Sequence, residues 1–159
     1  DSTIPMGGVM LRQGIYDTFM TGPDHVIELF HGYTYTGHPM AAAAALATLE
    51  VYKEEGLYER VLKLEPKWAD AAMTLKGHPL MQDILTLGLV AAIDLAPVAG
   101  SPGLRAYKAM ENGFHDHDIM LRITGDTIAL SPPLIIKEEQ IGEIFHEKIP
   151  AVLKSIENL

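Results

Sequence analysis

Hydroxyl, glycine and aromatic side chains crowd into a ten-residue run that ends at Pro39. The run reads FHGYTYTGHP over residues 30–39 and leads directly into an alanine-rich segment. Glycine lets a backbone approach a ligand closely, and amides and hydroxyls in front of a helix can bind a phosphate group. The run therefore predicts an anion-binding turn. The residue types alone also fit a plainer interpretation, in which a threonine hydroxyl only caps the next helix.

Arg122 is the second residue whose surroundings suggest chemistry. It lies in an apolar strand-like pattern, and a turn of Gly125, Asp126 and Thr127 follows it. A guanidinium held in a site can pair bidentately with a carboxylate. The alternative is a surface arginine that stabilises a hairpin.

The other polar clusters support neither a metal site nor a hydrolase. Residues 115–118 read HDHD, but neighbouring side chains point in different directions on a helix or a strand. We interpret this segment as a solvated turn and predict no metal. Ser2 and Ser131 lack the strand-turn-helix setting of a nucleophile, and neither has an assignable His-Asp partner.

Composition narrows the class of protein further. The 159 residues are 48% hydrophobic, which is enough for a buried core in one or two domains. A formal net charge of -9 argues against nucleic acid or an anionic membrane as a partner. No window approaches the ~18 apolar residues of a membrane span. Cysteine is absent and no signal-peptide pattern is present, so we expect a cytoplasmic protein.

Helical and strand-like patterns alternate along the chain and would position these candidates. Periodicity and turn residues predict the following elements: a strand over 6–11, a brief helix over 15–20, a long and mostly buried helix over 39–53 capped by Thr36, a helix over 57–75 kinked or broken at Pro66, one long strand over 84–95, a helix over 104–114, a hairpin of 119–123 and 127–130, and an amphipathic segment over 137–159 interrupted by Pro150. The order from residue 84 onward predicts a small α/β unit with a mostly antiparallel sheet covered on one side.

Three segments in this order resemble the C-terminal portion of class III (ω-type) aminotransferases, which use pyridoxal phosphate. Residues 4–9, IPMGGV, look like the strand that follows the cofactor lysine. Residues 31–39, HGYTYTGHP, look like the phosphate-binding loop, and residues 122–127, RITGDT, look like the substrate-carboxylate segment. The resemblance covers nearly the whole chain. Residues 128–136 look most like the branch of ω-amino acid (β-alanine):pyruvate aminotransferases.

The resemblance implies an α/β fold, the C-terminal part of a fold-type I pyridoxal-phosphate transferase. It implies three parts: the incomplete end of a large cofactor-binding domain over 1–38, a connecting helix over 39–56 and a small domain with a mostly antiparallel sheet over 57–159. It also implies that Tyr33 and Thr34 bind the cofactor phosphate of a neighbouring subunit and that Arg122 meets the carboxylate of an amino or keto acid. The expected assembly is a homodimer with cofactor sites at the interface.

The chain has no lysine at the position that this chemistry requires. Pyridoxal phosphate needs an amine for its internal Schiff base, yet the first lysine here is Lys53, inside a predicted helix. By the resemblance, the catalytic lysine lies a few positions before Asp1. We therefore expect part of a transaminase that moves an amino group from a β- or ω-amino acid or amine to pyruvate or a similar keto acid, and that is inactive as this fragment alone. A non-catalytic interaction or anion-binding module derived from the small domain is the alternative.

Overall fold

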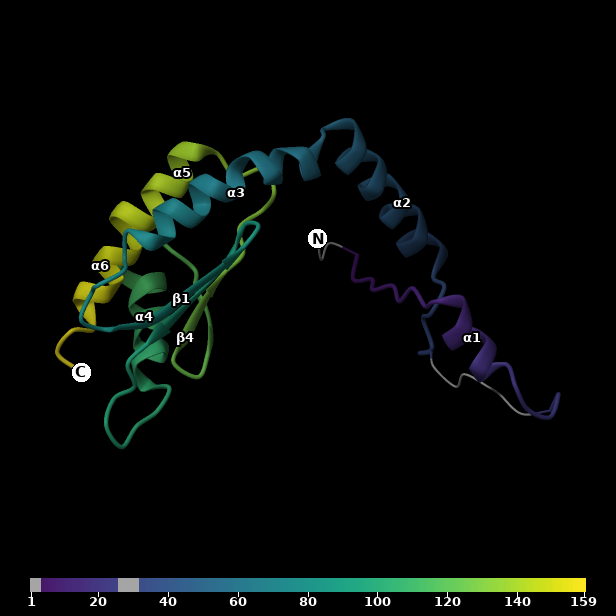
Figure 1. Cartoon of the computed structure of the whole chain (residues 1–159), viewed down its shortest axis with the longest axis horizontal. Helices are drawn as coiled ribbons and strands as arrows, with labels where there is room; N and C mark the ends of the chain where they lie inside the picture. The colour runs from purple at the N-terminus through teal and green to yellow at the C-terminus, as the bar shows by residue number, and fades with distance from the viewer. Residues whose placement is uncertain (1–3, 26–31) are drawn as a thin grey trace. The chain divides into compact units, whose positions relative to one another are not determined.

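The computed structural model describes residues 4–25 and 32–159, which divide into two compact units (Figure 1). Unit 1 is Asp1–Glu55 and unit 2 is Gly56–Leu159. Phe30 and His31, the first two residues of the polar run, lie outside the described residues.

Unit 1 contains the helices α1 (Gln13–Phe19) and α2 (Pro39–Glu54). The brief helix expected over 15–20 is therefore confirmed. The strand expected over 6–11 is wrong, because residues 5–12 have no regular secondary structure and are exposed. A strand needs a neighbouring strand for its backbone hydrogen bonds, and the described part of unit 1 provides none.

Helix α2 forms where the sequence predicts it, but two details differ. Its cap is His38, whose Nδ1 accepts a hydrogen bond from the amide of Ala41 at 3.4 Å, with Pro39 in the first turn. Thr36, the expected cap, instead accepts a hydrogen bond from Tyr33 inside the preceding turn. The helix has no buried residue, which contradicts the expected burial, because residues 4–8 cover it only in part, along Ala41, Ala44 and Ala45.

Unit 2 begins with α3 (Leu57–Met73), which continues through Pro66 without breaking into two helices. The long strand expected over 84–95 is in fact a hairpin of β1 (Met81–Leu87) and β2 (Val90–Leu95). Gly88 makes the turn possible because its φ is +56°, a conformation that costs glycine little. Its amide donates to a carboxylate oxygen of Glu65, which ties the hairpin to α3.

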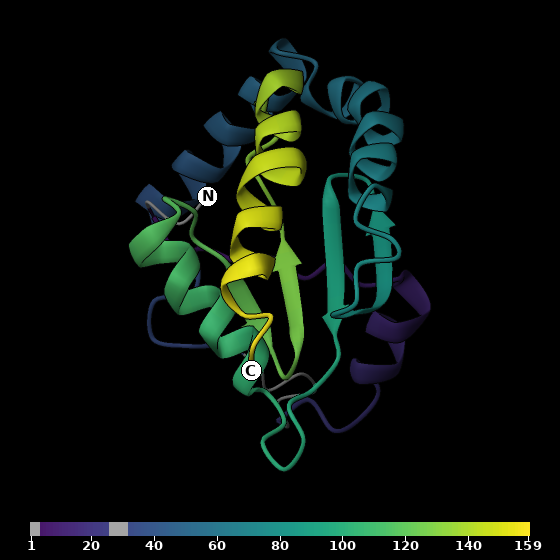
Figure 2. The same ribbon diagram turned by 90° about the vertical axis from the view of Figure 1, so that its left-hand side faces the viewer.

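The sheet of unit 2 has the order β1-β2-β4-β3, and every neighbouring pair is antiparallel. The expected second hairpin is confirmed as β3 (Arg122–Thr124) and β4 (Thr127–Leu130). The expected helix over 104–114 is α4 (Leu104–Asp116). Figure 2 shows the helices of unit 2 gathered on one face of this sheet. The mixed α/β architecture with an antiparallel sheet covered on one side is thus confirmed.

The last segment is helical throughout, as α5 (Glu138–Gly142), a π-helical stretch η1 (Glu143–Lys148) and α6 (Ile149–Ser155). The expected interruption at Pro150 takes the form of this π-helical stretch. Proline has no amide hydrogen and its ring crowds the carbonyl four residues earlier. One wider turn relieves that crowding without ending the helix.

The core of unit 2 lies between the sheet and these helices. At its centre the rings of Trp68 and Phe145 meet edge to face, with centroids 4.8 Å apart. Both side chains are fully buried, as are Ile93 and Ile128 from the middle strands. Among the described residues, no helix is long and apolar enough to cross a membrane.

Candidate functional site

The polar turn of unit 1 is organised by its own hydrogen bonds. The amide of Tyr33 donates to Oγ1 of Thr36 at 2.7 Å, and the amide of Thr36 donates back to the carbonyl of Tyr33 at 2.9 Å. The amide of His38 donates to the carbonyl of Tyr35 at 3.1 Å. Gly37 has a φ of +76° and allows the chain to turn into α2. Thr36 thus fixes the turn, and Thr34 is left at its tip.

This turn presents its side chains to solvent. Tyr33 is 83% exposed and Tyr35 is 79% exposed. Within residues 4–25 and 32–159, the side chain of Thr34 makes no hydrogen bond. A hydroxyl and backbone amides are the donors that a phosphate group requires, so the donor set of this turn fits the phosphate end of a cofactor.

A cleft of about 390 Å³ adjoins the turn in unit 1. Residues 4–7 form one wall, and Tyr33 together with residues 35–38 forms the other. Two of the segments singled out in the sequence therefore lie side by side, although they are far apart along the chain. Thr34 does not line this cleft. The one lysine in the described part of unit 1, Lys53, lies in the last turn of α2 and does not line this cleft.

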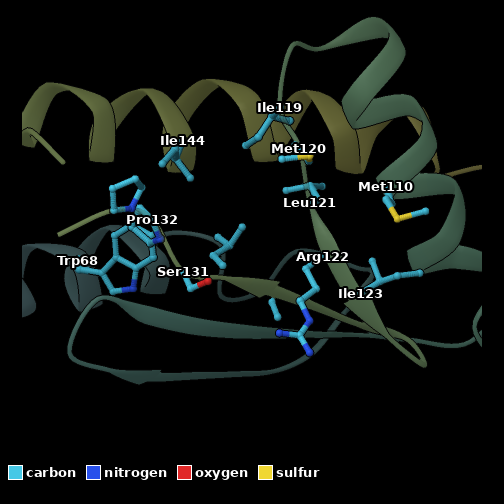
Figure 3. A pocket seen from close by; sticks show the side chains of 13 residues that line it. Trp68, Met110, Ile119, Met120, Leu121, Arg122, Ile123, Ser131, Pro132 and Ile144 are labelled. Carbon is cyan, nitrogen blue, oxygen red and sulfur yellow. The ribbon is translucent and has the colours of Figure 1, made fainter. Parts of the chain in front are cut away.

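Arg122 is the first residue of β3, where it pairs with Ala129 of β4. Side chains alternate across a strand, so Arg122 and its neighbour Ile123 lie on opposite faces. Figure 3 shows the guanidinium turned away from Ile144 and Ile119, toward the face without helices. Arg122 is exposed and makes neither an ion pair nor a side-chain hydrogen bond with the described residues. Its charge is therefore available to an anionic ligand.

An apolar cavity of about 680 Å³ opens beside Arg122 in unit 2 (Figure 3). It lies where β3 and β4 diverge, beyond the pair formed by Arg122 and Ala129. Trp68, Met110 and Ile144 line its inner side. No local pattern in the sequence indicates this cavity, because its lining comes from five separate segments. Those segments are α3, α4, residues 119–123 that lead into β3, residues 129–133 that lead out of β4, and η1.

Asp126 holds the turn that carries Arg122. Its carboxylate accepts a hydrogen bond from the amide of Gly103 at 2.6 Å, directly before α4. Its backbone carbonyl accepts from the amide of Leu95 at the end of β2. One residue thus joins the hairpin, β2 and the start of α4. The sequence pattern places Asp126 in the turn after Arg122 but carries no sign of this role.

A family profile described as "Aminotransferase class-III" matches residues 3–153. The "Omega-aminotransferase" of Caulobacter vibrioides is 45% identical over 99% of this chain, which spans 35% of that protein. The "Beta-alanine--pyruvate aminotransferase" of Pseudomonas aeruginosa is 34% identical over 91% of the chain and 33% of its own length. The chain therefore spans about a third of the curated relatives that it matches.

Among solved structures, the omega transaminase from Pseudomonas jessenii in complex with PMP superposes with a TM-score of 0.73 at 31% identity. The match covers 82% of this chain and 30% of that one. This likeness confirms the expected fold class, part of a fold-type I transferase.

Proposed function

The chain belongs to the class-III aminotransferase family, and we propose that it is the portion of a pyridoxal-phosphate-dependent transaminase that carries the phosphate turn and the substrate-binding arginine. The proposed reaction moves an amino group from a β- or ω-amino acid or amine to pyruvate or a similar keto acid. The observation that carries this proposal is the similarity to ω-aminotransferases over almost the whole chain.

In this proposal Thr34 and Tyr33 hold the cofactor phosphate. The turn suits a role at a subunit interface, because the side chains of Tyr33 and Tyr35 are largely exposed to solvent. This is the basis for proposing a homodimer in which the turn serves the cofactor of the neighbouring subunit. The cofactor, when bound, supplies the aldehyde that takes up the amino group and a ring that withdraws electrons from the reacting carbon.

Arg122 is proposed to bind the carboxylate of the amino or keto acid. A guanidinium offers two parallel donors to a carboxylate, which fixes the direction in which the substrate lies. Arg122 therefore orients the substrate but does not itself transfer a proton.

The predicted domains remain part of this proposal. We assign residues 1–38 to the end of the large cofactor-binding domain, residues 39–56 to a connecting helix and residues 57–159 to the small domain. The amine that binds the cofactor belongs to the rest of the enzyme, so the fragment alone should be inactive. We further propose a cytoplasmic location.

A chimera tests the proposed function. In it, this chain replaces the matching segment of the Caulobacter vibrioides relative, and alanine formation from pyruvate and β-alanine is measured. We expect an active enzyme. Arg122→Ala should lower kcat/KM for β-alanine by about 100-fold, because a charge-assisted bidentate contact is lost.

The same variant should change kcat/KM by less than about 3-fold for an amine donor that has no carboxylate. Lys63→Ala, at an exposed position of α3, is the matched control and should leave both rates unchanged. A folded chimera that transfers no amino group would contradict the proposed function. Equal losses of kcat/KM for both amine donors would show that Arg122 does not bind the substrate carboxylate.

A further inference from the structure

Trp68 carries an indole N–H group that unit 2 leaves without an acceptor. The side chain is fully buried, and its Nε1 atom makes no hydrogen bond with the residues that the structure describes. An indole nitrogen can only donate. Burying such a donor without an acceptor is costly, and most buried polar side-chain atoms have a protein, water or ligand partner. The acceptor for Trp68 is therefore expected to come from a bound molecule.

The surroundings of Trp68 explain why the protein itself supplies no acceptor. The indole meets the ring of Phe145 edge to face, and this contact between α3 and η1 holds it in one orientation. The backbone carbonyls of the two helical segments are used in helical hydrogen bonds. The buried side chains of the surrounding core cluster are apolar. The indole is thus fixed among groups that do not accept hydrogen bonds.

Trp68 also lines the apolar cavity of about 680 Å³ described above. Figure 3 shows Trp68 and Ser131 toward one end of this cavity and Met110 toward the other, with Ile144 between them. The lining side chains are apolar except for Trp68, Ser131 and Arg122. The guanidinium of Arg122 turns toward the face of the sheet without helices. The buried polar group in the wall of the cavity is therefore the indole N–H.

This combination selects one class of ligand. The volume is typical of sites for small molecules, and the apolar lining suits a hydrocarbon ring or chain. A ligand carboxylate would lose its hydration in this cavity without meeting a buried cation. A neutral carbonyl oxygen loses less hydration and is the acceptor that an indole N–H requires.

We propose that this cavity binds a small neutral molecule with an apolar body and one carbonyl group, whose oxygen accepts a hydrogen bond from Nε1 of Trp68. The inference goes beyond the proposed function and does not depend on it. Residues 119–123 line the cavity and lead into β3. A bound molecule would therefore contact the strand that carries Arg122.

The first experiment follows the indole N–H directly. Trp68 is the only tryptophan of the chain, so it gives a single indole signal in a proton–nitrogen NMR spectrum. Methyl benzoate is the probe, and ethylbenzene, an aromatic ring without an acceptor, is the matched probe. We expect methyl benzoate to move the indole proton downfield until the shift saturates, and ethylbenzene to move it far less. No saturable shift with methyl benzoate, or equal shifts with both probes, would overturn the proposal.

Trp68→Phe keeps an aromatic ring and removes the N–H group. It should weaken the binding of methyl benzoate about 5-fold more than that of ethylbenzene, because one hydrogen bond is lost. The methyl signals of Ile144 report the binding of both probes, and their comparison within one variant cancels the change in cavity shape. Tyr107→Phe, on α4 and outside the lining, is the control and should leave both affinities unchanged. Equal weakening for the two probes would contradict the proposed contact. If Trp68→Phe does not fold, the indole shift of the unaltered chain decides.

The rest of a transaminase is the competing occupant of this cavity. In the chimera with the Caulobacter vibrioides relative, methyl benzoate at ten times its dissociation constant should raise the melting temperature by about 1–2 °C. Trp68→Phe in the chimera should reduce this rise by about half. A folded chimera whose melting temperature does not respond would overturn the proposal, because the added protein would then fill the cavity.

Discussion

The carboxylate of Asp126 accepts a hydrogen bond from the amide of Gly103 at 2.6 Å, so a residue of the β3–β4 turn holds the N-cap residue of α4, which lies 23 residues earlier in the chain. Amides at a helix start have no partner within the helix, and a carboxylate there also meets the positive end of the helix dipole. This contact fastens the hairpin of Arg122 to α4.

Asp126→Ala should therefore destabilise unit 2 by about 1–2 kcal/mol, the usual cost of losing a helix cap. Asp126→Asn keeps an acceptor and should cost less. Urea unfolding followed by circular dichroism measures both. Asp70→Asn, at an exposed position of α3, is the control and should have little effect. A loss no larger than that of the control would show that the capping bond contributes nothing.

Arg105 should be the most sensitive charged residue in unit 2. Its guanidinium is buried and donates to the carbonyls of Ala96, Ile156 and Leu159 at 2.7, 2.9 and 3.0 Å. Removing it takes a charged donor away from three carbonyls, and that of Ile156 keeps only the amide of Leu159 at 3.4 Å. Arg105→Met should cost about 3 kcal/mol or more, because hydrogen bonds to charged groups are worth ~1.5–3 kcal/mol each.

Thermal and urea unfolding measure this loss. Lys108→Met on the same helix removes a cation at the surface and should cost far less than Arg105→Met. Arg105→Lys should fall between the two, because one ammonium cannot reach three carbonyls in the same geometry. If Arg105→Met were as stable as Lys108→Met, the three hydrogen bonds of Arg105 would contribute nothing to the stability of unit 2.

Elements whose signals are local could be predicted from the sequence. Helix α4 and the β3–β4 hairpin follow from helical periodicity and from a Gly125-Asp126 turn between two short apolar runs. The β1–β2 hairpin was missed because its turn residues, Gly88 and Leu89, sit inside one apolar run. Leu89 is itself buried, so hydrophobicity gave no sign of a turn there.

Features that depend on long-range contacts could not be predicted in the same way. The run around Thr34 and the position of Arg122 were recognisable as candidates from residue types. The face on which Arg122 lies depends on register with Ala129, and its support depends on a bond between Asp126 and Gly103. Neither relation leaves a periodic signal in a single sequence.

The exposed pair Lys108–Glu111 gives a pH dependence with a defined sign. The hydrogen bond and charge of Lys108 lower the pKa of Glu111 from its ordinary 4.5, and Glu111 likewise raises the pKa of Lys108 from 10.5. Because the pKa of Glu111 is lower in the folded protein, its carboxylate stabilises the fold above pH 4.5. This stabilisation is lost as the pH falls through the folded-state pKa of Glu111. Because the pKa of Lys108 is higher in the folded protein, its ammonium group stabilises the fold below pH 10.5. This stabilisation is lost as the pH rises through the folded-state pKa of Lys108.

The stability difference between wild type and Glu111→Gln should therefore be constant from about pH 5 to 9 and shrink on either side. Urea unfolding at a series of pH values measures it. Glu139→Gln, an exposed carboxylate of α5, is the control. A difference that grows as pH falls below 4.5 would have the wrong sign for this pair.

Two helical glycines should respond in opposite directions to the same substitution. At Gly113, a β-carbon would lie 3.1 Å from the carbonyl oxygen of Ile119 and 3.2 Å from Leu121. That carbonyl cannot easily shift, because the amide of Ile119 donates to Gly113 at 3.0 Å. At Gly142 the nearest atom is a His146 ring nitrogen at 3.8 Å, so the β-carbon has room.

Alanine is favoured over glycine in a helix by about 1 kcal/mol. Gly142→Ala should therefore stabilise unit 2 by about 0.5–1 kcal/mol. Gly113→Ala should destabilise it by about 1–2 kcal/mol, because the close contact outweighs the helix preference. Urea unfolding of the two variants and of the wild type measures both changes in the free energy of unfolding. A gain at both positions would mean that the segment before β3 moves aside from α4 at little cost.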